Sequence, residues 1–208
     1  MSNRRSNNQH RRPVRPNQGR VTELKRRTSN RQSDTTIQII TNGRQTELSY
    51  LKSLVSEYAQ SAAVVCRRVK FVNGAPVSLV KKANAMILEG GIDFVYAVSD
   101  KDQFDIAQAL HEQCDGVRLL ISNPCFEAWL ILHFEKCDSA IDGKHKALER
   151  LRRHLPRFDP NALDFTDFSP YVQKAADRAR ACGEAPLRNP STTLWQLVDT
   201  LTRDSETN

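Results

Sequence analysis

The sequence predicts an α/β fold: a mainly parallel sheet of about four strands flanked by helices, followed by a helical C-terminal extension. Two observations support this. Between residues 35 and 135, short apolar segments alternate with segments of helical periodicity. That alternation is typical of a parallel sheet covered on both faces. After residue 135 the apolar residues recur only at helical spacing, which predicts helices without further strands.

The central strand is the best-marked element. Residues 93–99 are rich in apolar side chains and follow a Gly90-Gly91 turn, a pattern that favours a buried parallel strand. The other strands are predicted at 36–41, 63–69 and 117–122. The intervening helices are predicted over 46–59, from Pro76 or Ser78 to Gly90, over 104–113 and over 125–134.

Three regions follow from these patterns. In the C-terminal part, helices are predicted over 144–155 and 170–182, and Ser191 is expected to cap a last helix. We therefore expect a disordered basic arm (1–34), an α/β core (35–135) and a helical extension packed on that core (136–208).

Charge is concentrated in the arm. Residues 1–32 hold nine Arg and one Lys against one acid, Glu23, so this part carries +9 of a chain whose net charge is +7. Such a segment has too few apolar residues to fold alone, and it could bind a phosphate backbone. The alternative is a solubilising tail. A basic helix face (Lys144, Lys146, Arg150 and Arg153) could likewise contact nucleic acid, although most such faces are only solvated.

The cysteines and the apolar segments bear on location. The five cysteines are widely spaced and include no Cys-x-x-Cys pair, which favours reduced thiols over a disulfide framework or a zinc site. There is no apolar run of the roughly 18–20 residues that a membrane span needs, and no apolar N-terminal signal region. We expect a cytoplasmic protein without a membrane segment.

Four acids follow predicted strands: Glu47, Asp100, Asp102 and Glu127. In open α/β sheets, ligands bind at the carboxyl ends of the strands. Clustered carboxylates need a positive partner, and Mg²⁺ prefers oxygen ligands. The alternative is structural: Asp100 would cap a helix, and Glu47 would be stabilised by a positive helix N-terminus.

Several segments resemble the RloB (AbiLii-like) family over roughly residues 35–202. They are Gly43-x-x-Thr46-Glu47, Asp100-Lys101-Asp102-Gln103-Phe104, Asn123-Pro124-Cys125-Phe126-Glu127-Ala128-Trp129-Leu130, His133-Phe134 and Asn189-Pro190-Ser191-Thr192. The resemblance implies a Toprim-like fold, the metal-binding fold of topoisomerases, primases and OLD-type nucleases. It also implies a role in bacterial restriction or abortive phage defence, often with an AAA/ABC-type ATPase encoded nearby.

The resemblance assigns roles to single residues. Glu47 matches the second acid of the Toprim Glu-Gly-x-x-Thr-Glu turn, and Asp100 and Asp102 match the Asp-x-Asp pair. The first Glu of the turn, the presumed acid/base, is Asn42 here. An amide cannot exchange a proton at neutral pH, although its carbonyl oxygen can accept a metal.

Two functions remain open. In the first, the chain is a nuclease for DNA or RNA in which Mg²⁺ or Mn²⁺ on Glu47, Asp100 and Asp102 polarises a phosphate and lowers the pKa of a bound water. Glu127 would support those ligands, and Lys101 and the basic helix would bind phosphates. In the second, Asn42 marks a weakened scaffold that binds nucleic acid or the ATPase without cutting.

Overall fold

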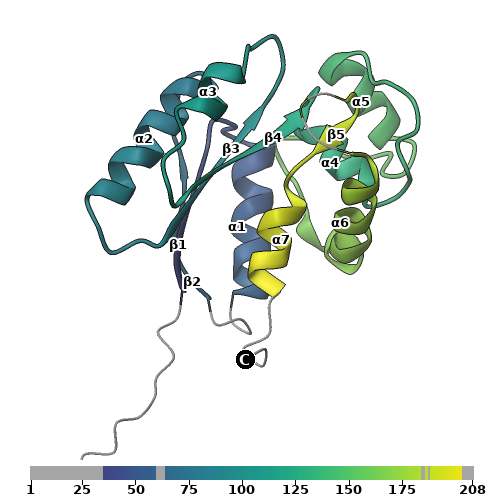
Figure 1. Cartoon of the computed structure of the whole chain (residues 1–208). Coiled ribbons are helices and arrows are strands. Elements are labelled where there is room, and N and C mark those ends of the chain that lie inside the picture. The colour runs from purple at the N-terminus through teal and green to yellow at the C-terminus, as the bar shows by residue number, and fades with distance from the viewer. Residues whose placement is uncertain (1–34, 60–63, 184–185, 187, 203–208) are drawn as a thin grey trace, which may run out of the picture. The chain divides into compact units, whose positions relative to one another are not determined.

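The sheet has five strands, in the order β2-β1-β3-β4-β5 (Figure 1). The computed structural model describes residues 35–59, 64–183, 186 and 188–202. The strands are β1 (Thr35–Thr41), β2 (Val64–Phe71), β3 (Phe94–Asp100), β4 (Val117–Asn123) and β5 (Ser191–Thr192). The first four are parallel, and only β5 is antiparallel to its neighbour. The predicted mainly parallel α/β sheet is confirmed.

Helices flank both faces of this sheet. They are α1 (Thr46–Tyr58), α2 (Pro76–Leu88), α3 (Ala107–His111), α4 (Phe126–Leu132), α5 (Gly143–Leu151), α6 (Val172–Ala181) and α7 (Trp195–Thr202), with 3₁₀ turns at Phe165–Asp167 and Ser169–Tyr171. In Figure 1, α2 and α3 lie on one side of the sheet and α1 and α7 on the other. None of the helices in the described ranges has the length and apolarity of a membrane span.

Strand periodicity divides the core between the two faces. Tyr96 and Val98 of β3 belong to one buried cluster, whereas Val95 and Ala97 belong to another, packed under α2. Successive side chains of a strand point to opposite faces, so an apolar run such as 94–98 fills both layers. This explains why the central strand could be recognised from its composition.

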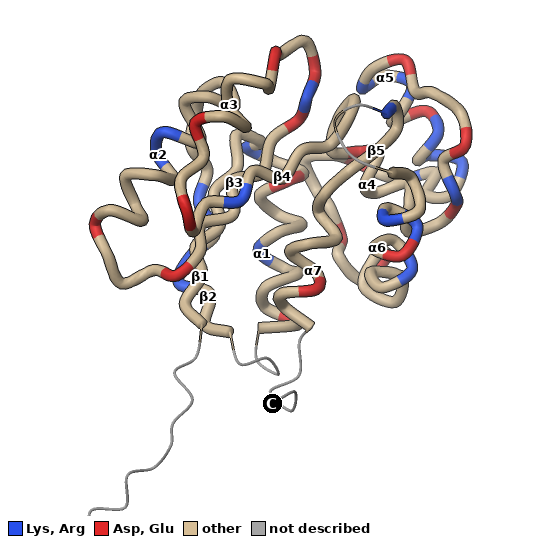
Figure 2. The backbone as a smooth tube through the Cα atoms, in the orientation of Figure 1, with Lys and Arg blue, Asp and Glu red and all other residues tan. Residues whose placement is uncertain are grey.

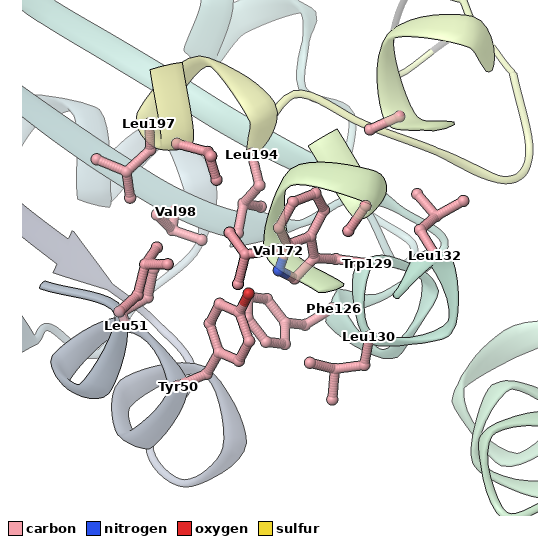
Figure 3. Close-up of a cluster of buried hydrophobic side chains, with 14 of the residues drawn as sticks. Tyr50, Leu51, Val98, Phe126, Trp129, Leu130, Leu132, Val172, Leu194 and Leu197 are labelled. Carbon is pink, nitrogen blue, oxygen red and sulfur yellow. The ribbon is translucent and has the colours of Figure 1, made fainter. Parts of the chain in front are cut away.

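The larger cluster is centred on aromatic rings from α1 and α4 (Figure 3). Tyr50 packs edge-to-face against Phe126 and Trp129, with ring centroids 5.6 and 6.3 Å apart. His133 lies in the same cluster: its Nδ1 is 3.1 Å from the Trp129 carbonyl and its Nε2 is 2.9 Å from the Tyr50 hydroxyl. Because a carbonyl only accepts, Nδ1 carries the proton and the Tyr50 hydroxyl donates to Nε2. Burial lowers the pKa of His133 to about 3, so the ring is a neutral part of the core.

The C-terminal region contributes a strand that the sequence did not predict. Ser191 does not cap a helix. Ser191 and Thr192 pair with β4, where Thr192 Oγ1 lies 2.9 Å from Ser122 Oγ, and α7 begins only at Trp195. The prediction failed because two residues carry no periodicity, and because their partner strand is some 70 residues away.

Two helix starts also differ. Thr46 opens α1 but does not cap it, since its hydroxyl donates to the Pro160 carbonyl instead, at 3.1 Å. Helix α3 begins at Ala107, not at Phe104, because residues 101–104 form a turn and Asp105 Oδ1 accepts the Ala107 amide hydrogen bond at 2.9 Å. The predicted basic arm (1–34) lies outside the described residues. Helices α5 and α6 pack on α4, and α7 packs on α1 and α6.

Candidate functional site

The candidate site lies where three parallel strands end side by side. Thr41 of β1 is in register with Val98 of β3, and Asp100 of β3 is in register with Ser122 of β4. The turn after β1 leads into α1, and the turn after β4 leads into α4. The sheet therefore brings the first turns of α1 and α4 to the end of β3, where Asp100 lies.

Glu47 is packed over a glycine. A Cβ atom placed on Gly43 would lie 2.0 Å from the Glu47 carboxyl carbon, so any side chain here would displace that carboxyl group. Glu47 itself is buried. Burial raises its pKa, Glu127 raises it further, and the Glu47 backbone amide and Lys144 lower it. Gly43 is thus needed for the position of Glu47, which is a local reason for the Gly-x-x-Thr-Glu spacing.

We expect Gly43→Ala to impair the candidate site while leaving the protein folded. The atom in the way is the end of a flexible side chain, so the free energy of unfolding should fall by no more than about 1 kcal/mol. The displaced carboxylate should nevertheless reduce any activity of the site on the order of 10-fold or more. Melting curves and activity of Gly43→Ala measure the two effects. Gly90→Ala is the control for activity: nothing lies within 4 Å of its added Cβ, and although its φ of +81° should lower the stability of that variant, Gly90 is not part of the site. Equal activity losses in the two variants would contradict the assignment.

Asp100 has the most strongly perturbed carboxyl group at this edge. Burial raises its pKa well above the usual 3.8, and the charges of Glu47 and Glu127 raise it further. Lys144 and the Phe126 backbone amide oppose this rise. Three carboxyl groups from α1, β3 and α4 therefore share one electrostatic environment, which makes the charged states of Asp100 and Glu47 costly.

Glu127 is fully buried and only partly satisfied. Its Oε1 is 3.0 Å from Lys144 Nζ, yet neither of its oxygens has a hydrogen-bond partner within the described part of the chain. A buried carboxylate without hydrogen bonds is expensive, and most native carboxylates avoid this state. The Lys144 ammonium offsets the charge on the Oε1 side, and Oε2 has neither an ion pair nor a hydrogen bond in the described part of the chain.

Lys144 reaches into this cluster from α5. Partial burial lowers its pKa, but Glu127, Glu47 and Asp100 together outweigh that effect and raise it. The helix is positioned from outside: Asn189 Nδ2 donates to the Ile141 carbonyl at 2.9 Å and Asn189 Oδ1 accepts from the Ile141 amide at 3.0 Å. Those bonds fix the chain three residues before Lys144. The sequence suggested an outward-facing lysine, and no local signal distinguishes it from its neighbours.

The acids that the structure brings together differ from the predicted set. Asp102 is exposed, and it is not among the charges that shift the pKa of Asp100 or Glu47. Its backbone is in the left-handed region, with φ +40°, and its amide donates to the Pro124 carbonyl at 3.0 Å. Glu127, which was expected only to support the metal ligands, is the acid whose charge raises the pKa of both Glu47 and Asp100.

The chemistry of these donors suits a hard divalent cation. Carboxylate oxygens are what Mg²⁺ prefers, and the unsatisfied Glu127 oxygens and the raised pKa values of Glu47 and Asp100 would both be relieved by added positive charge. Within the described ranges, however, no three His, Cys, Asp or Glu side chains already form a metal-binding group. In the arrangement seen, Lys144 supplies the positive charge.

Asn42 is held as a hydrogen-bond donor. Its Nδ2 donates to Ser99 Oγ at 2.9 Å and to the Gly74 carbonyl at 3.3 Å. The Ser99 hydroxyl in turn donates to the Asp100 carbonyl at 3.2 Å. A glutamate in this place could not make the two donations, so the surroundings of Asn42 match an amide.

The predicted phosphate-binding cations are mostly engaged elsewhere. Lys144 pairs with Glu127, Lys146 Nζ is 2.8 Å from Glu149, and Arg150 pairs with Glu135. Lys101 and Arg153 have no ion pair among the described residues. The basic helix face therefore offers less free charge than its sequence suggests.

Cys125 is a neighbour of the site that sequence reasoning passed over. Burial raises the pKa of its thiol, and the charges of Glu127 and Asp100 raise it further. The thiol is therefore protonated and unreactive at neutral pH. It acts as a small apolar wall of the cluster.

Comparison with known proteins adds one match. The model of a family described as RloB-like protein matches residues 37–201. No curated protein and no solved structure matches the chain. The matched range includes every element from β1 to α7 that contributes to the carboxylate cluster.

Proposed function

Since the chain belongs to the RloB-like family, we propose that it is a metal-dependent phosphodiester nuclease of a bacterial anti-phage or abortive-infection system. The observation that carries the proposal is the cluster of Glu47, Asp100 and Glu127 at the carboxyl ends of β1, β3 and β4, with both Glu127 oxygens buried and without hydrogen bonds. Carboxyl groups clustered in such a position, two of them (Glu47 and Asp100) with raised pKa values, are typical of functional sites.

Mg²⁺ or Mn²⁺ is the proposed cofactor. Glu47, Asp100 and Glu127 are the residues that would hold it, with Asp102 at the rim. When bound, such an ion would polarise the scissile phosphate and make a water molecule more acidic. The ion would also remove the repulsion that raises the pKa of Asp100.

The remaining roles belong to the chain itself. Gly43 keeps the Glu47 carboxyl group in place, and α5 holds Lys144 beside the acids. The Lys144 ammonium is suited to contact a phosphate oxygen, because its side chain is half exposed and its charge is retained by three acids. Lys101, partly buried directly after Asp100, would contact the same phosphate chain.

A second function has a specific observation in its favour. Asn42 replaces the presumed acid/base of Toprim enzymes, and its amide donates two hydrogen bonds that a carboxylate could not. This arrangement suits a scaffold that binds nucleic acid or an AAA/ABC-type ATPase without cutting. Both functions would be carried out in the cytoplasm. The five cysteines, all free thiols, are consistent with that reducing compartment.

A nuclease assay decides between them. The wild-type chain, Asp100→Asn and Asn42→Glu are incubated with single- and double-stranded DNA and RNA in Mg²⁺, Mn²⁺ or EDTA, with and without an ATPase encoded beside the gene. We expect metal-dependent cleavage by the wild type and a loss on the order of 100-fold or more in Asp100→Asn. Cleavage by Asn42→Glu alone would support the scaffold. Equal cleavage by wild type and Asp100→Asn would reject the proposed site.

A further inference from the structure

A second charged region lies away from the carboxylate cluster. It is a surface hollow of about 520 Å³ between the edge strand β2 and α2. Arg67, Arg68 and Lys70 of β2 and Lys82 of α2 line it, and Glu89 is the one acidic side chain in its wall. We call these four cations the basic hollow. Figure 2 shows Lys and Arg positions on α2 and on the strands beside it.

A β-bulge accounts for two of these cations. Ile37 of β1 is in register with Cys66, but Ile39 is in register with Val69, so Gln38 faces both Arg67 and Arg68. In a regular strand, neighbouring side chains point to opposite faces, whereas a bulge re-aims one of them. As a result, both arginines line the same hollow.

Gln38 holds this irregularity in place. It is almost fully buried, and its Nε2 donates to the Arg68 carbonyl at 2.9 Å and to the Ile39 carbonyl at 3.3 Å. The bulge therefore has its own internal support, and bulges of this kind commonly mark places where a strand presents a functional side chain. Gly91 adds room: a Cβ there would lie 3.2 Å from Arg67 Nη2.

Among the described residues, the four cations differ from Lys144, Lys146 and Arg150 of α5, each of which has an acidic partner. All are exposed, and none forms an ion pair among the residues that the structure describes. Basic side chains on an edge strand can simply prevent pairing with another sheet. That role does not require a bulge, nor a lysine from a different element that faces the same hollow.

The positive charge continues toward the candidate site. Arg44 lies over the ring of Phe71, the last residue of β2, with 4.8 Å between the guanidinium carbon and the ring centroid. Arg44 belongs to the turn that leads to Glu47. At about 3.3 Å per strand residue, the distance from the bulge to Phe71 is roughly 10–13 Å. A row of cations of this length matches several phosphates of a nucleic-acid strand.

We propose that the basic hollow binds the phosphodiester backbone of a nucleic acid and directs it along β2 toward the carboxylate cluster. The proposal rests on the proposed function, because it assumes that nucleic acid is the substrate. Backbone contacts of this kind position a strand without reading its sequence. The ligand is therefore defined by its regular phosphate charges.

Binding without cleavage tests the hollow alone. The full chain is titrated into fluorescently labelled 20-nucleotide DNA and RNA strands in EDTA, and anisotropy is recorded at several salt concentrations. We expect Arg67→Gln/Arg68→Gln/Lys82→Gln to weaken binding on the order of 10-fold or more at low salt. The slope of log K against log salt should fall by about 2–3, since each lost phosphate contact contributes about 0.7–0.9.

Matched controls keep the result specific. Lys52→Gln/Arg157→Gln/Lys174→Gln removes the same charge from exposed positions outside the hollow and should bind as the wild type does. Arg67→Lys/Arg68→Lys should retain most of the salt slope, and circular dichroism should show that every variant is folded.

Three outcomes would overturn the inference: no binding by the wild type in EDTA, equal binding by the hollow variant, or equal losses in the hollow and control variants. A hollow variant that aggregates but binds normally would assign these cations to protection of the sheet edge. If the proposed nuclease function is wrong but the basic hollow binds nucleic acid, the wild type will bind the strands in EDTA and will not cleave them in Mg²⁺.

Discussion

Asp100→Asn should abolish the response of the protein to Mg²⁺ and leave the metal-free protein at least as stable as the wild type at neutral pH. An ion that binds only the folded state at 100 times its dissociation constant adds about 2.7 kcal/mol. For a domain of this size that equals a rise of roughly 5–10 °C in melting temperature. The variant lacks one of the proposed ligands, so most of this rise should disappear. Thermal melts with EDTA, Mg²⁺ and Mn²⁺ measure it.

The pH dependence of the same variant has a definite sign. The folded-state pKa of Asp100 is raised above its usual 3.8 by burial and by Glu47 and Glu127. Its contribution to stability is therefore fully present below about pH 3.8 and is lost as the pH rises through the folded-state pKa. An asparagine does not titrate, so the advantage of Asp100→Asn in EDTA should grow across that window.

A capping aspartate would behave in the opposite way: replacement by alanine would cost about 1 kcal/mol, and metal would have no effect. A wild-type melting temperature that is the same in EDTA, Mg²⁺ and Mn²⁺ would reject the metal site. It would also remove the main support for the nuclease, while leaving the nucleic-acid binding of the basic hollow to be judged by its own test.

Lys144→Met should be the most destabilising surface substitution in α5. It removes the cation beside the buried Glu127 carboxylate, whose oxygens have no hydrogen bond within the described residues. Breaking a buried ion pair costs about 3–5 kcal/mol; because Lys144 is 52% exposed, we expect about 2–3 kcal/mol in EDTA. Urea denaturation measures this loss.

Lys146→Met is the matched control. Lys146, two residues after Lys144 in the same helix, pairs with Glu149 at 2.8 Å, but both side chains are about half exposed, at 58% and 46%. That pair should contribute below about 1 kcal/mol. Glu127→Gln/Lys144→Met should recover much of the stability, because no buried charge is left unpaired. Mg²⁺ should stabilise Lys144→Met more than the wild type if ion and ammonium serve the same acids. Equal losses in Lys144→Met and Lys146→Met would show that the buried pair has no special role.

Much of the fold follows from local patterns. The strands β1 to β4 were recognisable because apolar, β-branched segments alternate with helical periodicity, and each prediction differs from the observed strand by two residues at most at either end. The positions of Glu47, Asp100 and Glu127 at strand ends were recognisable for the same reason. In a parallel sheet, carboxyl ends must meet at one edge, so residues far apart in the chain are brought together by topology alone.

The remainder depends on contacts between distant segments. Strand β5 forms by pairing with the edge of β4, and α5, which packs on α4 and is preceded by the Asn189 bonds to Ile141, brings Lys144 to Glu127. The sequence could not distinguish Lys144 from Lys146, since both are lysines near the start of one amphipathic helix. Nor could it show that Asp102 is exposed whereas Glu127 is fully buried, because both acids follow a predicted strand in the sequence. Local periodicity therefore determined the layers of this protein, whereas tertiary hydrogen bonds and burial decided which charges face one another.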